Sequence, residues 1–159
     1  MTDMLVKLYA LPPLAPAVDR CTAAGVDIRR AITAEQHHIL KWIDTHFSDN
    51  WVSECSAAMT RQPVAVFVAV EDGELLGFAC YDTGYRGIFG PTGVSEAARG
   101  KGVGAALLLA CLHDMLAQGY AYAVIGWTGP QEFYAKVCGA TPIDDSRPGM
   151  YRGMLMKGE

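Results

Sequence analysis

Apolar residues recur along the chain with two spacings, and each spacing predicts a different kind of element. The β-branched run at 64–70 and the alternating run at 75–82 predict two strands. Between them, Glu71-Asp72-Gly73-Glu74 predicts a tight hairpin turn, because an Asp-Gly pair readily adopts positive φ. The same reasoning predicts further strands at 5–11, 26–32, 87–94 and 121–127.

Helical spacing is clearest in the stretch after residue 33. Apolar side chains fall on one helical face there at Ile39, Leu40, Ile43 and Phe47. Thr33 is expected to cap this helix, with Gln36 three residues later completing a capping box. Other helices are expected at 16–24, 52–61, 105–118 and 131–140, the first ended by Gly25 and the third by Gly119.

The end of the chain is expected to form a hairpin between residues 142–145 and 150–156. In order, the elements are a strand, helices, antiparallel strands, and then strand, helix, strand, helix and strand. That order predicts an α+β fold, a mixed α/β sandwich, in a single domain of residues 1–159.

Composition narrows the classes of partner. A formal net charge of −4 and a pI near 5.5 argue against nonspecific nucleic-acid binding, which needs a basic face. The longest apolar run, 103–112, is too short to span a bilayer, and Lys7 followed by prolines makes a poor signal peptide. We therefore expect a cytoplasmic protein with neither nucleic acid nor membrane as a partner.

The five cysteines are odd in number and widely spaced, at positions 21, 55, 80, 111 and 138. Without a C-x-x-C pair they predict neither a zinc site nor a disulfide framework, and no metal is expected. Most are expected to be small core residues in a reducing compartment.

A cluster of glycines precedes the longest apolar helix, in the segment Ala98-Arg99-Gly100-Lys101-Gly102-Val103-Gly104-Ala105. Glycine costs a helix about 1 kcal/mol relative to alanine, so three in alternation need a reason. A P-loop is excluded, because Lys101 is followed by glycine and not by serine or threonine. A dinucleotide-binding G-x-G-x-x-A pattern fits the letters, but no acidic residue ends the next strand to hold a ribose.

Two interpretations of the segment then remain. One is a phosphate-binding loop of the form R-x-x-G-x-G, filled by Arg99, Gly102 and Gly104 at a helix N-terminus. The other is a tight turn between a strand and a helix, without a ligand.

Two further features bear on this choice. The strand at 87–94 contains Gly90-Pro91, and because proline cannot donate to a ladder, regular pairing must fail there. The last helix carries Phe133-Tyr134 followed by Lys136 and, after it, Gly139. Together with the glycine segment, these features resemble the GNAT superfamily of N-acetyltransferases over roughly residues 27–156, with residues 1–26 as an N-terminal strand–helix extension.

The resemblance implies a central, mostly antiparallel, splayed sheet and an acetyl-CoA cosubstrate. Its pyrophosphate would bind the glycine segment, and its pantetheine arm would pair with backbone groups of Thr92 and Val94. The cosubstrate-binding residues implied are Thr92, Gly93, Val94, Arg99, Gly100, Lys101, Gly102, Val103, Gly104, Ala105, Phe133, Tyr134 and Lys136.

The resemblance also implies chemical roles. The Tyr134 hydroxyl would protonate the departing thiolate, and a backbone N–H near Val94 would hold the thioester oxygen. The family has no single motif for the base, and the candidates here are Glu54 and Asp82. Where many members carry asparagine after the penultimate strand, this chain has Trp127-Thr128, so Thr128 is a partial substitute or Trp127 lines the acceptor pocket.

The acceptor is expected to be a small cationic amine. The residues that suggest it are Trp51, Tyr81, Tyr85 and Trp127, with Glu54, Asp82, Asp144 and Asp145. The sequence thus predicts an acetyl-CoA-dependent N-acetyltransferase that transfers the acetyl group directly to a small amine, with a homodimer possible. The alternatives left open are a non-catalytic acyl-CoA-binding sensor or interaction module on the same fold, and a longer acyl group.

Overall fold

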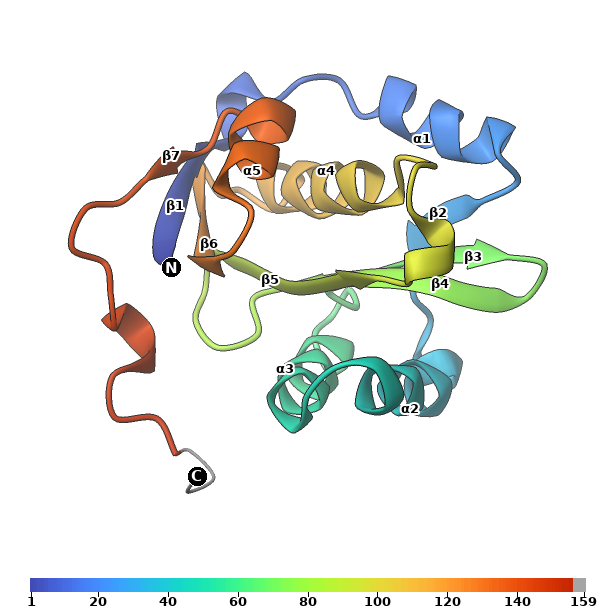
Figure 1. Ribbon diagram of the computed structural model, residues 1–159, viewed down its shortest axis with the longest axis horizontal. Coiled ribbons are helices and arrows are strands. Elements are labelled where there is room, and N and C mark those ends of the chain that lie inside the picture. The colour runs from blue at the N-terminus through green and yellow to red at the C-terminus, as the bar shows by residue number, and fades with distance from the viewer. Residues whose placement is uncertain (156–159) are drawn as a thin grey trace.

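The computed structural model describes residues 1–155, and its centre is one seven-stranded sheet (Figure 1). The strands lie in the order β2-β3-β4-β5-β6-β1-β7. Their bounds are β1 Thr2–Lys7, β2 Asp27–Arg30, β3 Val66–Glu71, β4 Glu74–Tyr81, β5 Ile88–Val94, β6 Tyr122–Thr128 and β7 Thr141–Pro142. Every neighbouring pair is antiparallel except β5 and β6, which are parallel. This confirms the predicted fold class.

Helices cover both faces of the sheet (Figure 1). Helices α1, α4 and α5 lie on one face, and α2 and α3 lie on the other. Their bounds are α1 Ala15–Ala23, α2 Gln36–His46, α3 Asp49–Met59, α4 Val103–Ala117 and α5 Gln131–Cys138. Helix α4 is buried over most of its circumference between the sheet and α1, which explains why its sequence is apolar almost throughout.

The sheet opens between β5 and β6. The two strands pair only where Ile88 meets Val124 and Phe89 meets Ile125. Beyond these pairs β5 continues through Gly90-Pro91, where proline has no N–H for a ladder, and the strands diverge. The expected break in this strand is therefore confirmed, and it leaves one edge of β5 unpaired inside the sheet.

The hairpin turn is also as predicted, with Asp72 and Gly73 both at positive φ. The first strand differs from its prediction: it covers Thr2–Lys7, and Leu8–Ala10 form a 3₁₀ turn. Because β1 lies between β6 and β7, the expected N-terminal extension supplies an interior strand of the sheet.

Two local predictions are wrong. Thr33 does not begin a helix through a capping box with Gln36; Thr33–Glu35 form a 3₁₀ turn, and the Glu35 carboxylate accepts the N–H of Ile32 at 2.9 Å. The C-terminal hairpin does not form either. Thr141–Pro142 pair with β1, and the segment predicted as the second strand contains the 3₁₀ turn Gly149–Tyr151, while its end, Met156, lies outside the described residues.

Three further observations concern residues 1–155. No helix among them is long and apolar enough to cross a bilayer. No group of three or more metal-binding side chains occurs in this part of the chain. All five cysteines are buried and unpaired.

Candidate active site

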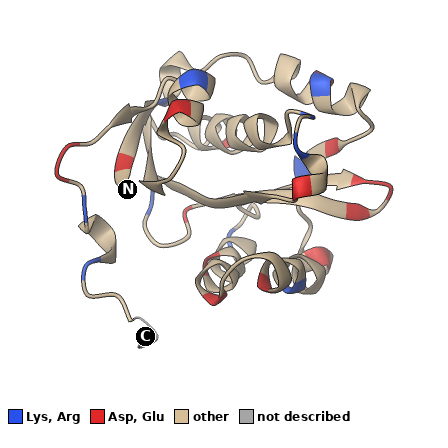
Figure 2. Cartoon of the chain, in the orientation of Figure 1, with Lys and Arg blue, Asp and Glu red and all other residues tan. Residues whose placement is uncertain are grey.

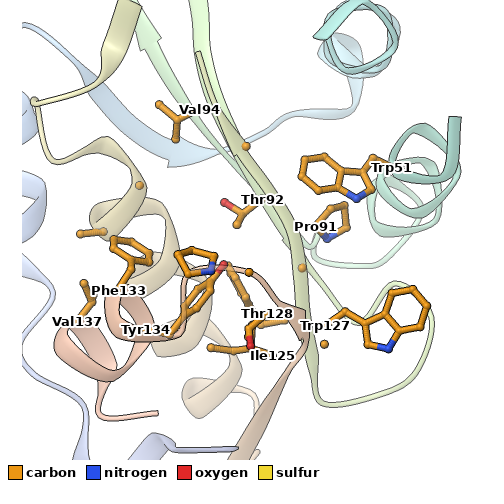
Figure 3. A pocket seen from close by; sticks show the side chains of 18 of the residues that line it. Trp51, Pro91, Thr92, Val94, Ile125, Trp127, Thr128, Phe133, Tyr134 and Val137 are labelled. Atoms are coloured by element: carbon orange, nitrogen blue, oxygen red, sulfur yellow. The ribbon is translucent and has the colours of Figure 1, made fainter. Parts of the chain in front are cut away.

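A cleft of about 1120 Å³ occupies the opening between β5 and β6 (Figure 3). Its walls come from helices on both faces of the sheet: α4 and α5 on one side and α3 on the other. In Figure 3, Val94, Phe133 and Tyr134 lie on one side of β5, whereas Trp51 and Trp127 lie on the other. The cleft thus passes through the sheet at the point where its ladder is interrupted.

The unpaired edge of β5 presents backbone groups to this cleft. On its other edge, the N–H of Ser95 donates to the carbonyl of Leu76 at 2.8 Å. Hydrogen-bonded pairs in an antiparallel ladder recur every second residue, so Gly93 bonds toward β4. The N–H and C=O groups of Thr92 and Val94 consequently point toward β6 and are available to a ligand.

The glycine segment connects this edge to α4. Gly100 and Gly102 have φ of +87° and +77°, a region that residues with a Cβ rarely adopt, so the path of the loop depends on them. Gly102 is the residue before the helix, and the first N–H groups of α4 have no carbonyl partner within the helix. Together with the helix dipole, these N–H groups suit an anion.

Cations also line the cleft, but not all those that were predicted. Arg99 and Lys136 line the cleft. Lys101 does not: its ammonium group forms an ion pair with Glu71 at 2.9 Å, at the end of β3. Arg20 of α1 lines the cleft instead, and its guanidinium donates to the carbonyl of Gly100 at 3.2 Å. Figure 2 shows these charges on α1, α5 and the loop before α4.

Tyr134 extends from α5 toward β5 (Figure 3). Its ring packs edge-on against Phe133 and Phe89, with centroid separations of 5.2 and 6.5 Å. The residue is 7% exposed, and its hydroxyl has no hydrogen-bond partner among residues 1–155. Burial, with a smaller contribution from Cys138, raises the pKa of Tyr134 to about 12. The phenol therefore holds its proton at neutral pH and presents it to the cleft.

Glu54 lies on the opposite side, in the wall formed by α3. Trp51 is one helical turn earlier and faces the same cleft. The hydroxyl of Tyr151 lies 3.4 Å from the Glu54 carboxylate and donates to it. Burial raises the pKa of Glu54, and the Tyr151 hydrogen bond only partly opposes that shift. A half-buried carboxylate whose pKa is raised fits a proton acceptor.

Asp82 is not part of this cleft. Its carboxylate accepts the N–H of Gly87 at 2.7 Å and the hydroxyl of Tyr120 at 2.6 Å, and it is 7% exposed. It fixes the turn between β4 and β5, so its placement does not fit the predicted base. Tyr81 is also removed from the cleft, because it is buried and donates to Asp114. Other residues suggested for the acceptor pocket that do not line this cleft are Tyr85, Asp144 and Asp145.

Asp82→Ala is accordingly expected to destabilise the fold and to leave the chemistry of the cleft intact. Two donors would lose their buried acceptor, which costs roughly 1–3 kcal/mol in the free energy of unfolding. Urea denaturation measures this loss. Reduced activity in a variant that remains folded would instead indicate that Asp82 takes part in the reaction.

The segment Trp127-Thr128 is held by the first strand. The Thr128 hydroxyl donates to the carbonyl of Thr2 at 2.8 Å, so its proton is not free for a ligand. The N–H of Trp127, a residue at positive φ, donates to the Asp3 carboxylate at 2.9 Å. The Trp127 ring packs on Tyr151 with centroids 4.5 Å apart, and both rings line the cleft. Trp127 therefore turns its ring to the cleft, whereas the hydroxyl of Thr128 is engaged by β1.

Among the cleft residues that sequence reasoning missed are Arg20 and Tyr151. Arg20 reaches the cleft because α1 packs on α4, and nothing in its local sequence indicates that contact. Tyr151 was assigned to a strand that does not form. Its hydrogen bond to Glu54 joins residues 97 positions apart.

Comparisons with known proteins agree with this geometry. The Acetyltransferase (GNAT) family profile matches residues 31–140, which include the glycine segment and α5. Comparison with curated proteins gave no match.

Solved structures show the same fold at low sequence identity. A fungal multi-domain β-N-acetylglucosaminidase with a GCN5-related glucosamine N-acetyltransferase region is 14% identical, with a TM-score of 0.72 over 89% of this chain and 19% of that one. A GCN5-related N-acetyltransferase from Sphaerobacter thermophilus is 20% identical, with a TM-score of 0.69 over 89% and 48%. One from Kribbella flavida is 17% identical, with a TM-score of 0.59 over 89% and 53%.

The chain thus spans from a fifth to about half the length of these neighbours. The family profile covers more than two thirds of the chain itself, including α3, β5, α4, β6 and α5, which supply most of the cleft lining. The protein belongs to the GNAT acetyltransferase family.

Proposed function

We propose that the protein transfers an acetyl group from acetyl-CoA directly to the primary amine of a small molecule. The observation that carries this proposal is the cleft through the sheet. It joins an anion site and a free strand edge on one side to a half-buried carboxylate on the other. Such a cleft lets a long, anionic donor and a separate acceptor meet at the opening, as direct transfer in a ternary complex requires.

The donor would lie along the side formed by α4 and α5. The N–H groups at the start of α4, with Arg20 and Arg99, suit a pyrophosphate. Thr92 and Val94 offer backbone groups to the amide groups of a pantetheine arm. A Cβ added to Gly104 would lie 3.7 Å from Phe133 and 3.8 Å from Val94. Both are ordinary van der Waals distances, so the protein neighbours of Gly104 do not by themselves require glycine there.

The chemical step forms one C–N bond and breaks one C–S bond. Glu54 takes the proton of the acceptor ammonium, and the neutral amine attacks the thioester carbonyl carbon. The N–H of Val94 donates to the oxygen of the tetrahedral intermediate. As that intermediate collapses, Tyr134 donates its proton to the departing thiolate, leaving an N-acetyl amine and free CoA. The attacking nitrogen loses its second proton to solvent as the intermediate collapses. Of the two protons that the ammonium gives up, one restores Tyr134 through Glu54 and solvent, and the other is released to bulk water.

Binding and transfer are tested separately. Calorimetry with acetyl-CoA measures donor binding, and release of free CoA thiol across a panel of amines measures transfer. Glucosamine belongs in the panel, because the region of the fungal neighbour is named for it. Donor binding with no transfer to any amine would favour the acyl-CoA sensor.

The buried, unpaired cysteines support a reducing compartment such as the cytoplasm.

Two cations of the same loop should differ in their effect on donor binding. Arg99→Ala removes a cation that lines the cleft, and we expect the Kd for acetyl-CoA to rise about tenfold, equivalent to ~1.4 kcal/mol. Lys101→Ala is the matched control, because Lys101 is held by Glu71 outside the cleft. Calorimetry measures the Kd for acetyl-CoA in both variants. An equal loss of affinity in the two would contradict this assignment of the anion site.

A further inference from the structure

The end of the cleft away from the glycine segment has its own character. We call it the acceptor end and define it by Trp51, Glu54, Trp127 and Tyr151. Tyr151 connects the other members, since its hydroxyl lies 3.4 Å from the Glu54 carboxylate and its ring packs on Trp127. Trp51 and Trp127 lie on the same side of β5 in Figure 3. Three aromatic rings and one carboxylate therefore line this end.

Charge is divided unequally along the cleft. The cationic side chains that line it are Arg20, Arg99 and Lys136, and they come from α1, from the loop before α4 and from α5. Glu54 is the only acidic side chain among the described residues of the lining. Two arginines lie on the same segment as Tyr151, and neither of them lines the cleft: they are Arg147 and Arg152. Outside the lining, the buried carboxylate of Asp3 accepts the N–H of Trp127.

This division suits some amines and rejects others. An ammonium group is attracted to a carboxylate and to the faces of aromatic rings. A flat or apolar substituent gains by packing on the indole and phenol rings. An acidic substituent beside the reacting amine would meet Glu54, and none of the four side chains that define the acceptor end is cationic. Discrimination against that substituent follows from the repulsion.

Resting on the proposed function, we propose that the acceptor is a small primary amine on an apolar or aromatic group that carries no acidic substituent. The class includes aralkyl and alkyl amines and excludes free amino acids. The amine lies between Glu54 and the opening beside β5, and its substituent lies against Trp51, Trp127 and Tyr151.

Three ligands with one ring test the proposal on the complex of the protein with CoA. Phenethylamine is cationic, 2-phenylethanol is its neutral analogue, and phenylalanine adds a carboxylate to the amine. Calorimetry should give phenethylamine a Kd at least tenfold below that of either other ligand. A Kd for phenylalanine equal to or below that of phenethylamine would overturn the proposal.

A variant then tests whether the Glu54 carboxylate causes the preference for the cationic amine. In Glu54→Gln the difference between phenethylamine and 2-phenylethanol should fall below threefold, while the Kd for CoA stays unchanged. The exposed Glu74→Gln is the matched control and should keep the full difference. Retention of the full difference in Glu54→Gln would overturn the role of the carboxylate, and the wild-type series decides on its own if that variant does not fold.

The inference and the proposed function can fail independently. The order of the three Kd values tests the chemistry of the acceptor end whether or not an acetyl group is transferred. Release of CoA thiol tests transfer whatever that order is. Binding in the expected order with no transfer would contradict the proposed acetyltransferase activity and leave the amine preference in place. Transfer to phenylalanine as fast as to phenethylamine would contradict the amine preference alone.

Discussion

Tyr134→Phe should lower kcat by roughly 10²–10⁴-fold while leaving the Kd for acetyl-CoA nearly unchanged. The substitution removes one oxygen and keeps the ring that packs against Phe133 and Phe89. Because burial raises the pKa of Tyr134 to about 12, the wild-type phenol holds a proton until a strong base forms beside it. The departing thiolate is such a base, and the same burial disfavours its charge. Without the phenol, the thiolate must leave unprotonated.

A second tyrosine provides the control for this experiment. Tyr120→Phe also removes a phenol oxygen from a partly buried site, where that hydroxyl donates to Asp82 and not to the cleft. Its kcat should stay within about twofold of the wild type, although its free energy of unfolding falls by about 1 kcal/mol. Steady-state rates at saturating acetyl-CoA measure both variants. Equal rates in Tyr134→Phe and the wild type would remove Tyr134 from the reaction.

The features of the fold that were predictable from sequence are those determined over a few residues. The turn at Asp72-Gly73 follows from the positive φ that this pair accepts. The break in β5 follows from the missing N–H of Pro91. The position of β1 between β6 and β7 was not predictable, since strand order depends on contacts across more than a hundred residues.

The same division applies to the site. Gly100 and Gly102 indicate the loop in the sequence, because few other residues adopt the positive φ found at these two positions. Lys101, between them, carries the right charge but points to Glu71, and only the packing of the loop on β3 determines that. Asp82 was chosen for its place at a strand end, yet its oxygens are engaged by a turn and by Tyr120. Residue type and spacing indicate a site, but the direction of a side chain depends on its tertiary neighbours.

Glu54→Gln is expected to lower kcat/KM by roughly 10²-fold or more, because general-base catalysis contributes about that much. Burial raises the pKa of Glu54, so the folded chain binds this proton more tightly than the unfolded chain does. The resulting stability is present below the ordinary carboxylate range and is lost as the pH rises through the raised value. At neutral pH the ionised carboxylate therefore lowers the free energy of unfolding, and the glutamine variant should be at least as stable as the wild type.

The pH profile separates this base from a merely structural carboxylate. In the wild type, kcat/KM should rise with pH as Glu54 ionises, above the usual range of a glutamate, and rise again as the free amine loses its proton. Glu54→Gln should lose the first rise and keep the second, while Glu74→Gln keeps both. Thermal or urea denaturation at neutral pH completes the comparison. A glutamine variant that is less stable than the wild type and keeps the first rise would show that Glu54 only supports the fold, and that another group or a chain of water takes the proton.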